Sequence, residues 1–187
     1  FYIYIIIAVF IGGLMVGRTP EFMGHKVEAR EVKIAALVTL LSAFLIKGGT
    51  ALAAYYFVQH ADAAWAVKPS AWLNNPGNHG FSEMFYEFAS ANANNGSGFE
   101  GLGDNNTFWN VTTGIVLLLG RFLPIIGPIA IAGLQAKKKY IPESSGTLKV
   151  DSGTFGILTF AIIIIITALS YFPPLVLGPI AEYLGMQ

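Results

Sequence analysis

Long apolar runs limit what this chain can fold into more than any other feature of its sequence. Two of them cover residues 115–134 (IVLLLGRFLPIIGPIAIAGL) and 154–172 (TFGILTFAIIIIITALSYF). A helix needs about 20 such residues to cross the roughly 30 Å of hydrocarbon in a bilayer. The chain is 54% hydrophobic and 12% charged, whereas a soluble domain carries about 25% charged residues. The sequence therefore predicts an all-α integral membrane protein whose main solvent is the lipid bilayer.

Charge and cysteine content exclude two broad classes of function. The chain has 11 basic and 11 acidic residues, so it has no basic surplus with which to hold nucleic acid. We expect no nucleic-acid partner. Cysteine is absent, which excludes disulfides and thiolate metal sites and leaves the redox compartment open.

Hydropathy divides the chain into four membrane segments. They cover residues 1–16, 34–58, 108–136 and the first part of 154–187. The first segment begins without Met and without a basic region, and we interpret it as a truncated span. The alternative, a cleaved secretory segment, would need a small-residue cleavage site before Arg18 and would be slightly long.

Basic loops predict the orientation of these spans. Residues 17–33 and 137–153 carry most of the Lys and Arg residues, the latter between positions 137 and 149. Basic loops lie on the cytoplasmic side as a rule, so both are predicted to face the cytoplasm. Residues 59–107 hold Lys68 as their only Lys or Arg, and they and the C-terminus are predicted to be extracytoplasmic.

The outer segment contains a second kind of membrane element. An outer loop, 59–78, ends in the turn cluster NPGNHG and leads to a short helix predicted over 79–91. A helix of this length is too short to span a bilayer and is typical of a core, interfacial or re-entrant segment. The residues that follow, 92–98, are rich in Asn and Gly, which disfavour both helix and strand.

A span, a short helix, an Asn/Gly segment and a second span are the parts of a potassium-channel pore loop. A dehydrated potassium ion needs oxygens in place of its hydration shell, and irregular backbone at membrane depth is tolerated where it lines a cavity. We predict that backbone carbonyls of Ala93, Asn94, Asn95 and Gly96 supply one chain's share, with Ser97 next in the filter. Gly96 permits the positive φ angles that such a loop requires, and Asn tolerates them best among other residues.

The same residues also fit an exposed turn. Asn95, Asn105 and Asn110 each begin an N-x-S/T sequon, and Asn/Gly loops are common on protein surfaces. From residue types alone, the filter and the exposed turn are about equally favoured.

Six short strings resemble one protein family in order and spacing along all 187 residues. They are GRTPEFMG (17–24), NPGNHGFSE (75–83), NNGSGFEGL (94–102), GRFLPII (120–126), SSGTL (144–148) and LGPIAEYL (177–184). They resemble the C-terminal third of the potassium-binding subunits of Kdp potassium-transporting ATPases, which are bacterial plasma-membrane complexes.

This resemblance implies a potassium-channel-like repeat with flanking transmembrane helices. Residues 34–136 would be the fourth pore-loop repeat, and residues 1–16 would end the third. Asn94, Asn95 and Gly96 fall on the filter positions that bind K⁺. The chain would be non-catalytic itself, with ATP hydrolysis on a P-type ATPase catalytic subunit and with accessory subunits as further partners. Two residues depart from the family pattern: Ala93, where an Asn is frequent, and Lys47, where the residue is usually apolar.

Charged residues inside the predicted membrane segments are the remaining candidates. Arg121 lies near the centre of the third span, where an unpaired charge costs about 3 kcal/mol. The resemblance implies an electrostatic barrier below the filter; a structural ion pair is the alternative. Lys47 extends to the interface, pairs with a carboxylate, or marks a repacked span.

Acidic residues of the short helix allow two further interpretations. Glu83 and Glu87 are predicted to anchor the helix by hydrogen bonds or to line the ion entry. Together with His79 they share one helix face and could in principle bind a metal ion. A membrane metalloenzyme is therefore an alternative function of another class. A passive or ion-coupled potassium transporter of the same architecture is the nearer alternative. No transported ion or cofactor other than K⁺ is expected.

Overall fold

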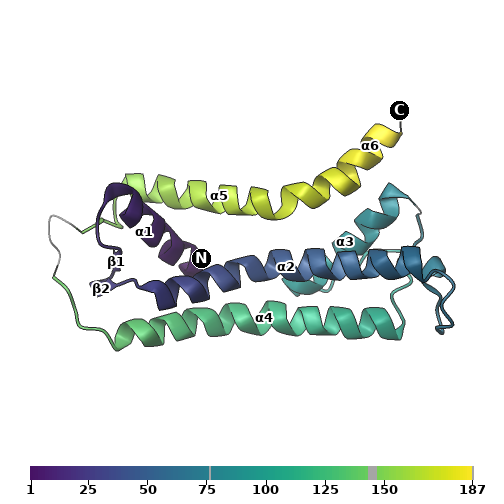
Figure 1. The fold of residues 1–187 in the computed structure, drawn as a ribbon, viewed down its shortest axis with the longest axis horizontal. Helices are drawn as coiled ribbons and strands as arrows, with labels where there is room; N and C mark the ends of the chain where they lie inside the picture. Colours follow the sequence, from purple (N-terminus) through teal and green to yellow (C-terminus); the bar gives the residue numbers. More distant parts are fainter. Residues whose placement is uncertain (76, 143–146, 187) are drawn as a thin grey trace. The chain divides into compact units, whose positions relative to one another are not determined.

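The computed structural model describes residues 1–75, 77–142 and 147–186, and nearly all of its regular structure is helical (Figure 1). The helices are α1 (Tyr2–Val16), α2 (Ala29–Gln59), η1 (Pro69–Ala71), α3 (Asn78–Ala93), α4 (Thr107–Ala136), α5 (Gly153–Leu175), η2 (Val176–Ile180) and α6 (Ala181–Gly185). Strands β1 (Glu21–Phe22) and β2 (His25–Lys26) form one short antiparallel hairpin, which the sequence did not predict. The all-α membrane fold is confirmed. Pro76 of the turn cluster, 143–146 of the predicted loop 137–153 and Gln187 lie outside the described residues.

Among the residues that the structure describes, three helices are long and apolar enough to cross a membrane. They are α2, α4 and the continuous stretch from Gly153 to Gly185. Helix α1 is a shorter apolar helix. Helix α2 begins five residues before the predicted start at 34. Its start is stabilised by Glu31, whose carboxylate accepts a hydrogen bond from the backbone N–H of Glu28 (2.9 Å).

The last helix continues beyond the predicted end near Phe172. It passes through Pro173 and Pro174 and then widens into η2, a π-helical turn. Pro179 explains the widening, because its ring would clash with the carbonyl of Leu175 and it has no N–H to donate. The N–H of Ala181 instead bonds to the carbonyl of Val176, five residues earlier.

The chain forms two compact units. Unit 1 consists of residues 1–40 and 123–169, and unit 2 of residues 41–122 and 170–187. The core of unit 1 surrounds α1, whose residues Ile6, Ala8 and Val9 are fully buried. They pack with Val27, Ala35, Ile131, Phe155 and Ile162. The apolar run 1–16 is therefore covered on much of its surface by protein within this unit.

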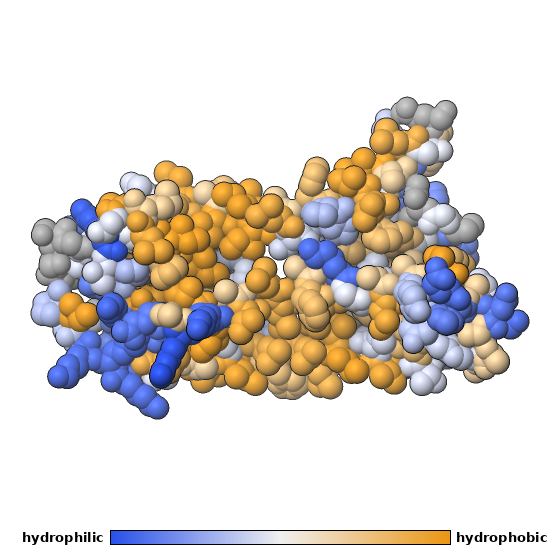
Figure 2. Space-filling model, viewed as in Figure 1, coloured by the Kyte–Doolittle hydropathy of each residue, from blue (hydrophilic) through white to orange (hydrophobic). Residues whose placement is uncertain are grey.

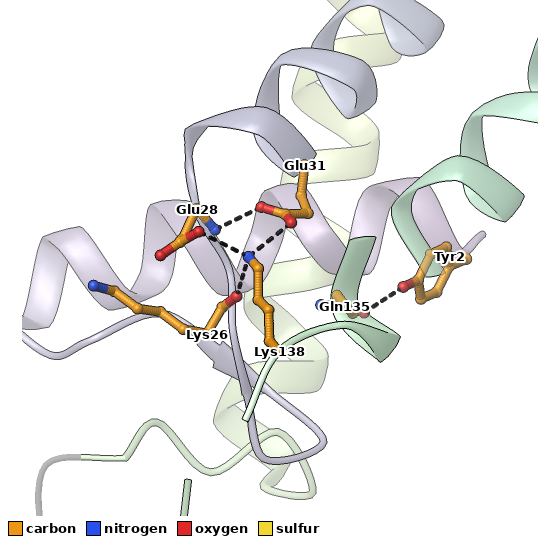
Figure 3. A network of polar contacts seen from close by, with 6 residues as sticks. All are labelled: Tyr2, Lys26, Glu28, Glu31, Gln135 and Lys138. Carbon is orange, nitrogen blue, oxygen red and sulfur yellow. Dashed lines mark hydrogen bonds and ion pairs between the residues drawn. The ribbon is translucent and has the colours of Figure 1, made fainter. Parts of the chain in front are cut away.

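A polar network joins the end of α4 to the start of α2 in unit 1 (Figure 3). The Nζ atom of Lys138 lies 2.7 Å from Glu31 Oε1 and 3.1 Å from Glu28 Oε2, and it donates to the carbonyl of Lys26 (2.9 Å). Glu31 is 1% exposed, so Lys138 neutralises a carboxylate that is nearly inaccessible to water. Hydrophilic residues gather at this end of unit 1, whereas apolar residues cover the helices (Figure 2).

Unit 2 contains the candidate site. Its core is aromatic: Trp72, Phe88 and Trp109 are each at most 1% exposed. Trp72 stacks on Phe108, with ring centroids 4.7 Å apart. These contacts join the outer loop, α3 and the first part of α4, and they hold α3 as a short helix inside the unit.

Candidate functional site

Helix α3 leads into the segment predicted as the filter. It ends because Asn94 adopts the left-handed conformation (φ 57°, ψ 35°), and the Asn94 N–H bonds to the Ala91 carbonyl (3.1 Å). Asn is one of the few residues that adopt this conformation readily. The helix ends two residues later than predicted, so Ala93 belongs to its last turn and not to the loop. The partial negative charge of the helix C-terminus faces the residues that follow.

Side chains of α3 fix the segment after Asn94. The Asn95 Oδ1 atom accepts hydrogen bonds from the Ser97 N–H (3.0 Å), the Ser97 hydroxyl (2.9 Å) and the Ser90 hydroxyl (2.6 Å). The Tyr86 hydroxyl lies 2.9 Å from Ser97 Oγ. Ser90 and Tyr86 are four residues apart and share a helix face. The loop is therefore folded back against α3 by its side chains.

The main-chain carbonyls of this loop remain available. In the described part of the chain, the carbonyl oxygens of Asn94, Asn95 and Gly96 accept no hydrogen bond. Asn95, Gly96 and Ser97 are exposed. Gly96 has φ +72°, and no atom lies within 4 Å of the position a Cβ would take. Conformation, and not packing, requires glycine here.

Glu83 anchors the chain that enters α3. It is fully buried, and its carboxylate accepts hydrogen bonds from the backbone N–H groups of Asn74 (3.0 Å) and Asn75 (2.8 Å). The Asn75 side-chain amide donates a third bond (2.9 Å). Three donors satisfy a charge that would otherwise be costly to bury. This carboxylate therefore has a role in holding structure.

Glu87, one turn later, anchors the chain that leaves the loop. Its Oε2 atom accepts the Phe99 N–H at 2.9 Å. A Cβ on Gly98 would lie 2.9 Å from the same oxygen, so only glycine allows this approach. Burial raises the pKa of the Glu87 carboxyl, the hydrogen bond from Phe99 opposes the rise, and the charge of Asp104 adds to it. Glu83 and Glu87 together hold both ends of the polypeptide around α3.

The three side chains of the metalloenzyme alternative have different partners. His79 Nδ1 lies 2.7 Å from Glu182 Oε1, while Glu83 and Glu87 bind backbone N–H groups. Among the described residues, no group of three His, Cys, Asp or Glu side chains is placed to hold a metal ion. The geometry therefore offers no support for metal chemistry at these residues.

Helix α4 approaches the end of α3 closely. A Cβ on Gly120 would lie 2.7 Å from the carbonyl oxygen of Asn92 and 3.0 Å from its Oδ1. The Asn94 side-chain amide donates to the Leu117 carbonyl (3.3 Å), one turn earlier on α4. The residue after Gly120 is Arg121, which is exposed in this chain. It forms no ion pair with any residue that the structure describes. Arg121 thus follows directly on the contact that joins α4 to the end of α3.

Lys47 lies beside a small apolar cavity in unit 2. The cavity has a volume of about 190 Å³ and is lined by α2, α3 and the last helix. Its lining includes Thr50, Phe81, Phe85, Pro173 and Leu177. Lys47 is half-buried, and in the described ranges it has no carboxylate partner.

Several residues of the site had no role assigned from the sequence, although Asn92 and Gly98 lie within the predicted segment 92–98. Ser90, Asn92, Gly98 and Gly120 all contact the candidate filter or its supports. A glycine directly before an intramembrane arginine is the one signal that pointed to Gly120. The other three residues, Ser90, Asn92 and Gly98, contact residues that come next to them only when the chain folds.

Comparison with known proteins places this geometry in context. Residues 1–184 match the family model described as potassium-transporting ATPase A subunit. The chain is 67% identical to the potassium-transporting ATPase potassium-binding subunit of Flavobacterium johnsoniae, over 100% of this chain and 33% of that protein. It is 64% identical to the subunit of the same name in Phocaeicola vulgatus, over 100% of this chain and 32% of that protein. For Geobacillus kaustophilus the identity is 47%, over 98% of this chain and 31% of that protein. The chain spans about a third of the length of these relatives.

Proposed function

Given that this chain belongs to the potassium-transporting ATPase A subunit family, we propose that it supplies one quarter of the filter that selects K⁺ in an ATP-driven uptake complex. Helices α2, α3 and α4 are the span, pore helix and span of the fourth repeat, and α1 ends the third. ATP hydrolysis takes place on a P-type catalytic subunit, with accessory subunits in the same assembly. The chain binds and passes the ion and performs no covalent chemistry itself.

One observation supports this proposal most directly: the three consecutive carbonyl oxygens that follow the C-terminus of α3 accept no hydrogen bond from any residue that the structure describes. Carbonyl oxygens in a ring replace the hydration shell of K⁺ in pore-loop filters. The oxygens of Asn94, Asn95 and Gly96 are the transported ion's ligands in this proposal. Ala93 and Ser97 flank them on the inner and outer sides. The negative end of α3 favours a cation at that position.

We also propose that the chain lies in a bacterial plasma membrane with the orientation given by its basic loops. Residues 17–33 and 137–149 face the cytoplasm, and residues 59–107 and the C-terminus face outward. The outer segment, which carries Asp62, Glu100 and Asp104 besides Glu83 and Glu87, then lies at the ion entrance. Arg121, one residue beyond the Gly120–Asn92 contact, acts as an electrostatic barrier below the filter.

Potassium-stimulated ATP hydrolysis by the purified complex tests this function. Two versions of the complete subunit, wild type and Gly96→Asp, are each assembled with the partner subunits and reconstituted. We expect the wild-type complex to hydrolyse ATP in response to K⁺ and the variant to need more K⁺ or to accept other cations. Potassium flux without any need for ATP would favour a passive or ion-coupled transporter. Unchanged ion preference in Gly96→Asp would count against the filter assignment.

A further inference from the structure

The carboxyl-terminal segment, residues 176–185 (η2 and α6), contacts one end of α3. Gly178 is buried, and a Cβ there would lie 2.9 Å from Ser82 Oγ and 3.0 Å from the Phe81 ring. Such distances are shorter than ordinary van der Waals contact. Glycine at this position is therefore what permits η2 to approach α3 so closely.

The π-helical turn fixes which residue makes this contact. Pro179 interrupts the α-helical hydrogen bonds, and the Ala181 N–H bonds five residues back, to Val176. One extra residue in a turn rotates every later side chain relative to a regular helix. The position of α6 against α3 therefore depends on this local change of helix type.

A polar contact adds to the packing. His79 Nδ1 lies 2.7 Å from Glu182 Oε1. His79 is in the first turn of α3, and Glu182 is in the first turn of α6. The His79 and Gly178 contacts all fall within residues 79–82. They restrain the N-terminal end of α3 only.

The opposite end of α3 is restrained by different residues. There Asn92 lies against Gly120, and Asn94 donates to Leu117. Helix α3 has 16 residues, a length of about 24 Å. A rigid helix held at both ends changes its tilt when one end moves, and the carbonyls that follow its C-terminus move with it.

We propose that the carboxyl-terminal segment is a positioning element for ion selection. By holding the N-terminal end of α3, it sets the tilt of this helix and with it the position of the carbonyls of Asn94–Gly96. This inference rests on the proposed function of those carbonyls. Residues Gly178, His79 and Glu182 are positioning residues, since their contacts are at the N-terminal end of α3 and not at the carbonyls of Asn94–Gly96.

The test compares ion preference in the complete complex. Three variants are assayed: Gly178→Val, His79→Gln and Glu182→Gln. For each, we measure the K⁺ concentration and the Rb⁺ concentration that half-stimulate ATP hydrolysis, and the ratio of the two reports ion preference. We expect Gly178→Val to change the ratio of the two concentrations at least about 3-fold, because overpacking displaces α3. The two polar variants should shift the ratio in the same direction, and their double variant no further than either alone. Gly156→Val is the control, because Gly156 lies on the same continuous helix and nothing surrounds its Cβ position within 4 Å.

Each outcome decides the proposal. An unchanged ratio in assembled Gly178→Val and in both polar variants overturns it, and so does an equal shift in Gly156→Val. If Gly178→Val does not assemble, the polar variants decide alone: a shifted ratio supports the proposal and an unchanged one overturns it. Gly96→Asp in the same assay distinguishes a failure of this inference from a failure of the filter assignment. If Gly96→Asp shifts the ratio and the other variants do not, only this inference fails; if Gly96→Asp leaves it unchanged, the filter assignment itself fails.

Discussion

Gly120 of α4 lies directly against Asn92 of α3, so that a methyl group at Gly120 would come within 2.7 Å of the Asn92 carbonyl oxygen. This contact joins the end of α3 to the residue before Arg121. The carbonyl belongs to the last turn of α3 and cannot move without changing the start of the candidate filter.

Replacing Gly120 should therefore disturb the site. Gly120→Val is expected to lower the stability of the complex by about 1–3 kcal/mol through overpacking and to raise the K⁺ concentration needed for half-stimulation. Gly114→Val on the same helix is the control, since its Cβ position has no atom within 4 Å. Thermal unfolding and ATPase titration measure both effects. Equal behaviour of the two variants would show that the contact is unimportant.

The backbone conformation of Gly96 predicts that different substitutions there lower K⁺ affinity by different amounts. Because φ is +72° and no atom surrounds the Cβ position, a side chain there is penalised by conformation and not by a clash. Gly96→Asn should retain more K⁺ affinity than Gly96→Val, since Asn adopts positive φ more easily. The energy difference is about 1 kcal/mol, or several-fold in half-stimulating K⁺. The reverse order would contradict the assigned conformation.

For Arg121, the proposed barrier predicts an effect on coupling. Arg121→Gln removes the charge and should lower the number of ions moved per ATP hydrolysed while the subunits still assemble. Arg121→Lys keeps the charge and should retain most of the coupling. Ion flux and ATP hydrolysis measured together in proteoliposomes check both variants. Loss of assembly in Arg121→Gln would instead indicate a structural ion pair with another part of the complex.

The hydrogen bond between Glu87 and Phe99 predicts that two substitutions of Glu87 differ in their effect on stability. Glu87→Gln keeps an oxygen that can accept the Phe99 N–H, whereas Glu87→Ala leaves this donor without a partner, which costs about 1–3 kcal/mol. The alanine variant should therefore unfold at a lower temperature than the glutamine variant. Similar melting temperatures for the two variants would show that this hydrogen bond contributes little.

The raised pKa of Glu87 also predicts a pH effect. Helix α3 is not one of the spanning helices, and its Glu87 carboxyl keeps a proton in the folded state at a pH where the unfolded chain would release it. This contribution to stability is present below the ordinary value of 4.5 and is lost as pH rises through the raised pKa. Wild type should lose more stability than Glu87→Gln across that range. Identical pH profiles of thermal unfolding would contradict the shift.

In unit 1, the pair of Lys138 and Glu31 predicts a large effect of a single substitution. Lys138→Met leaves a carboxylate that is 1% exposed without its cation, at a cost of about 3 kcal/mol. Adding Glu31→Gln should recover much of the stability. Lys137→Met is the control, since Lys137 is exposed. The melting temperatures of wild type, the two single lysine variants and the double variant test this prediction. Equal values for Lys137→Met and Lys138→Met would rule out the pair as a stabilising contact.

Much of the fold follows from local sequence. The predicted starts of the third and fourth spans differ from the observed ones by one residue, because apolar runs of that length have no other stable arrangement in a bilayer. The end of α3 was predicted two residues early. The difference arises because the left-handed conformation of Asn94, and not the composition of the segment, terminates the helix.

The sequence by itself determined that this is a membrane-spanning α-helical chain with a short helix and an Asn/Gly loop between two spans. Apolar length and glycine placement are local properties, and the backbone must satisfy its hydrogen bonds within lipid whatever the neighbours are. Only the tertiary structure decided that Gly120 meets Asn92, that Gly178 meets Ser82, and that Lys138 neutralises Glu31. Those pairs lie far apart in the chain, and their contacts depend on how helices pack, which no local pattern of residues specifies.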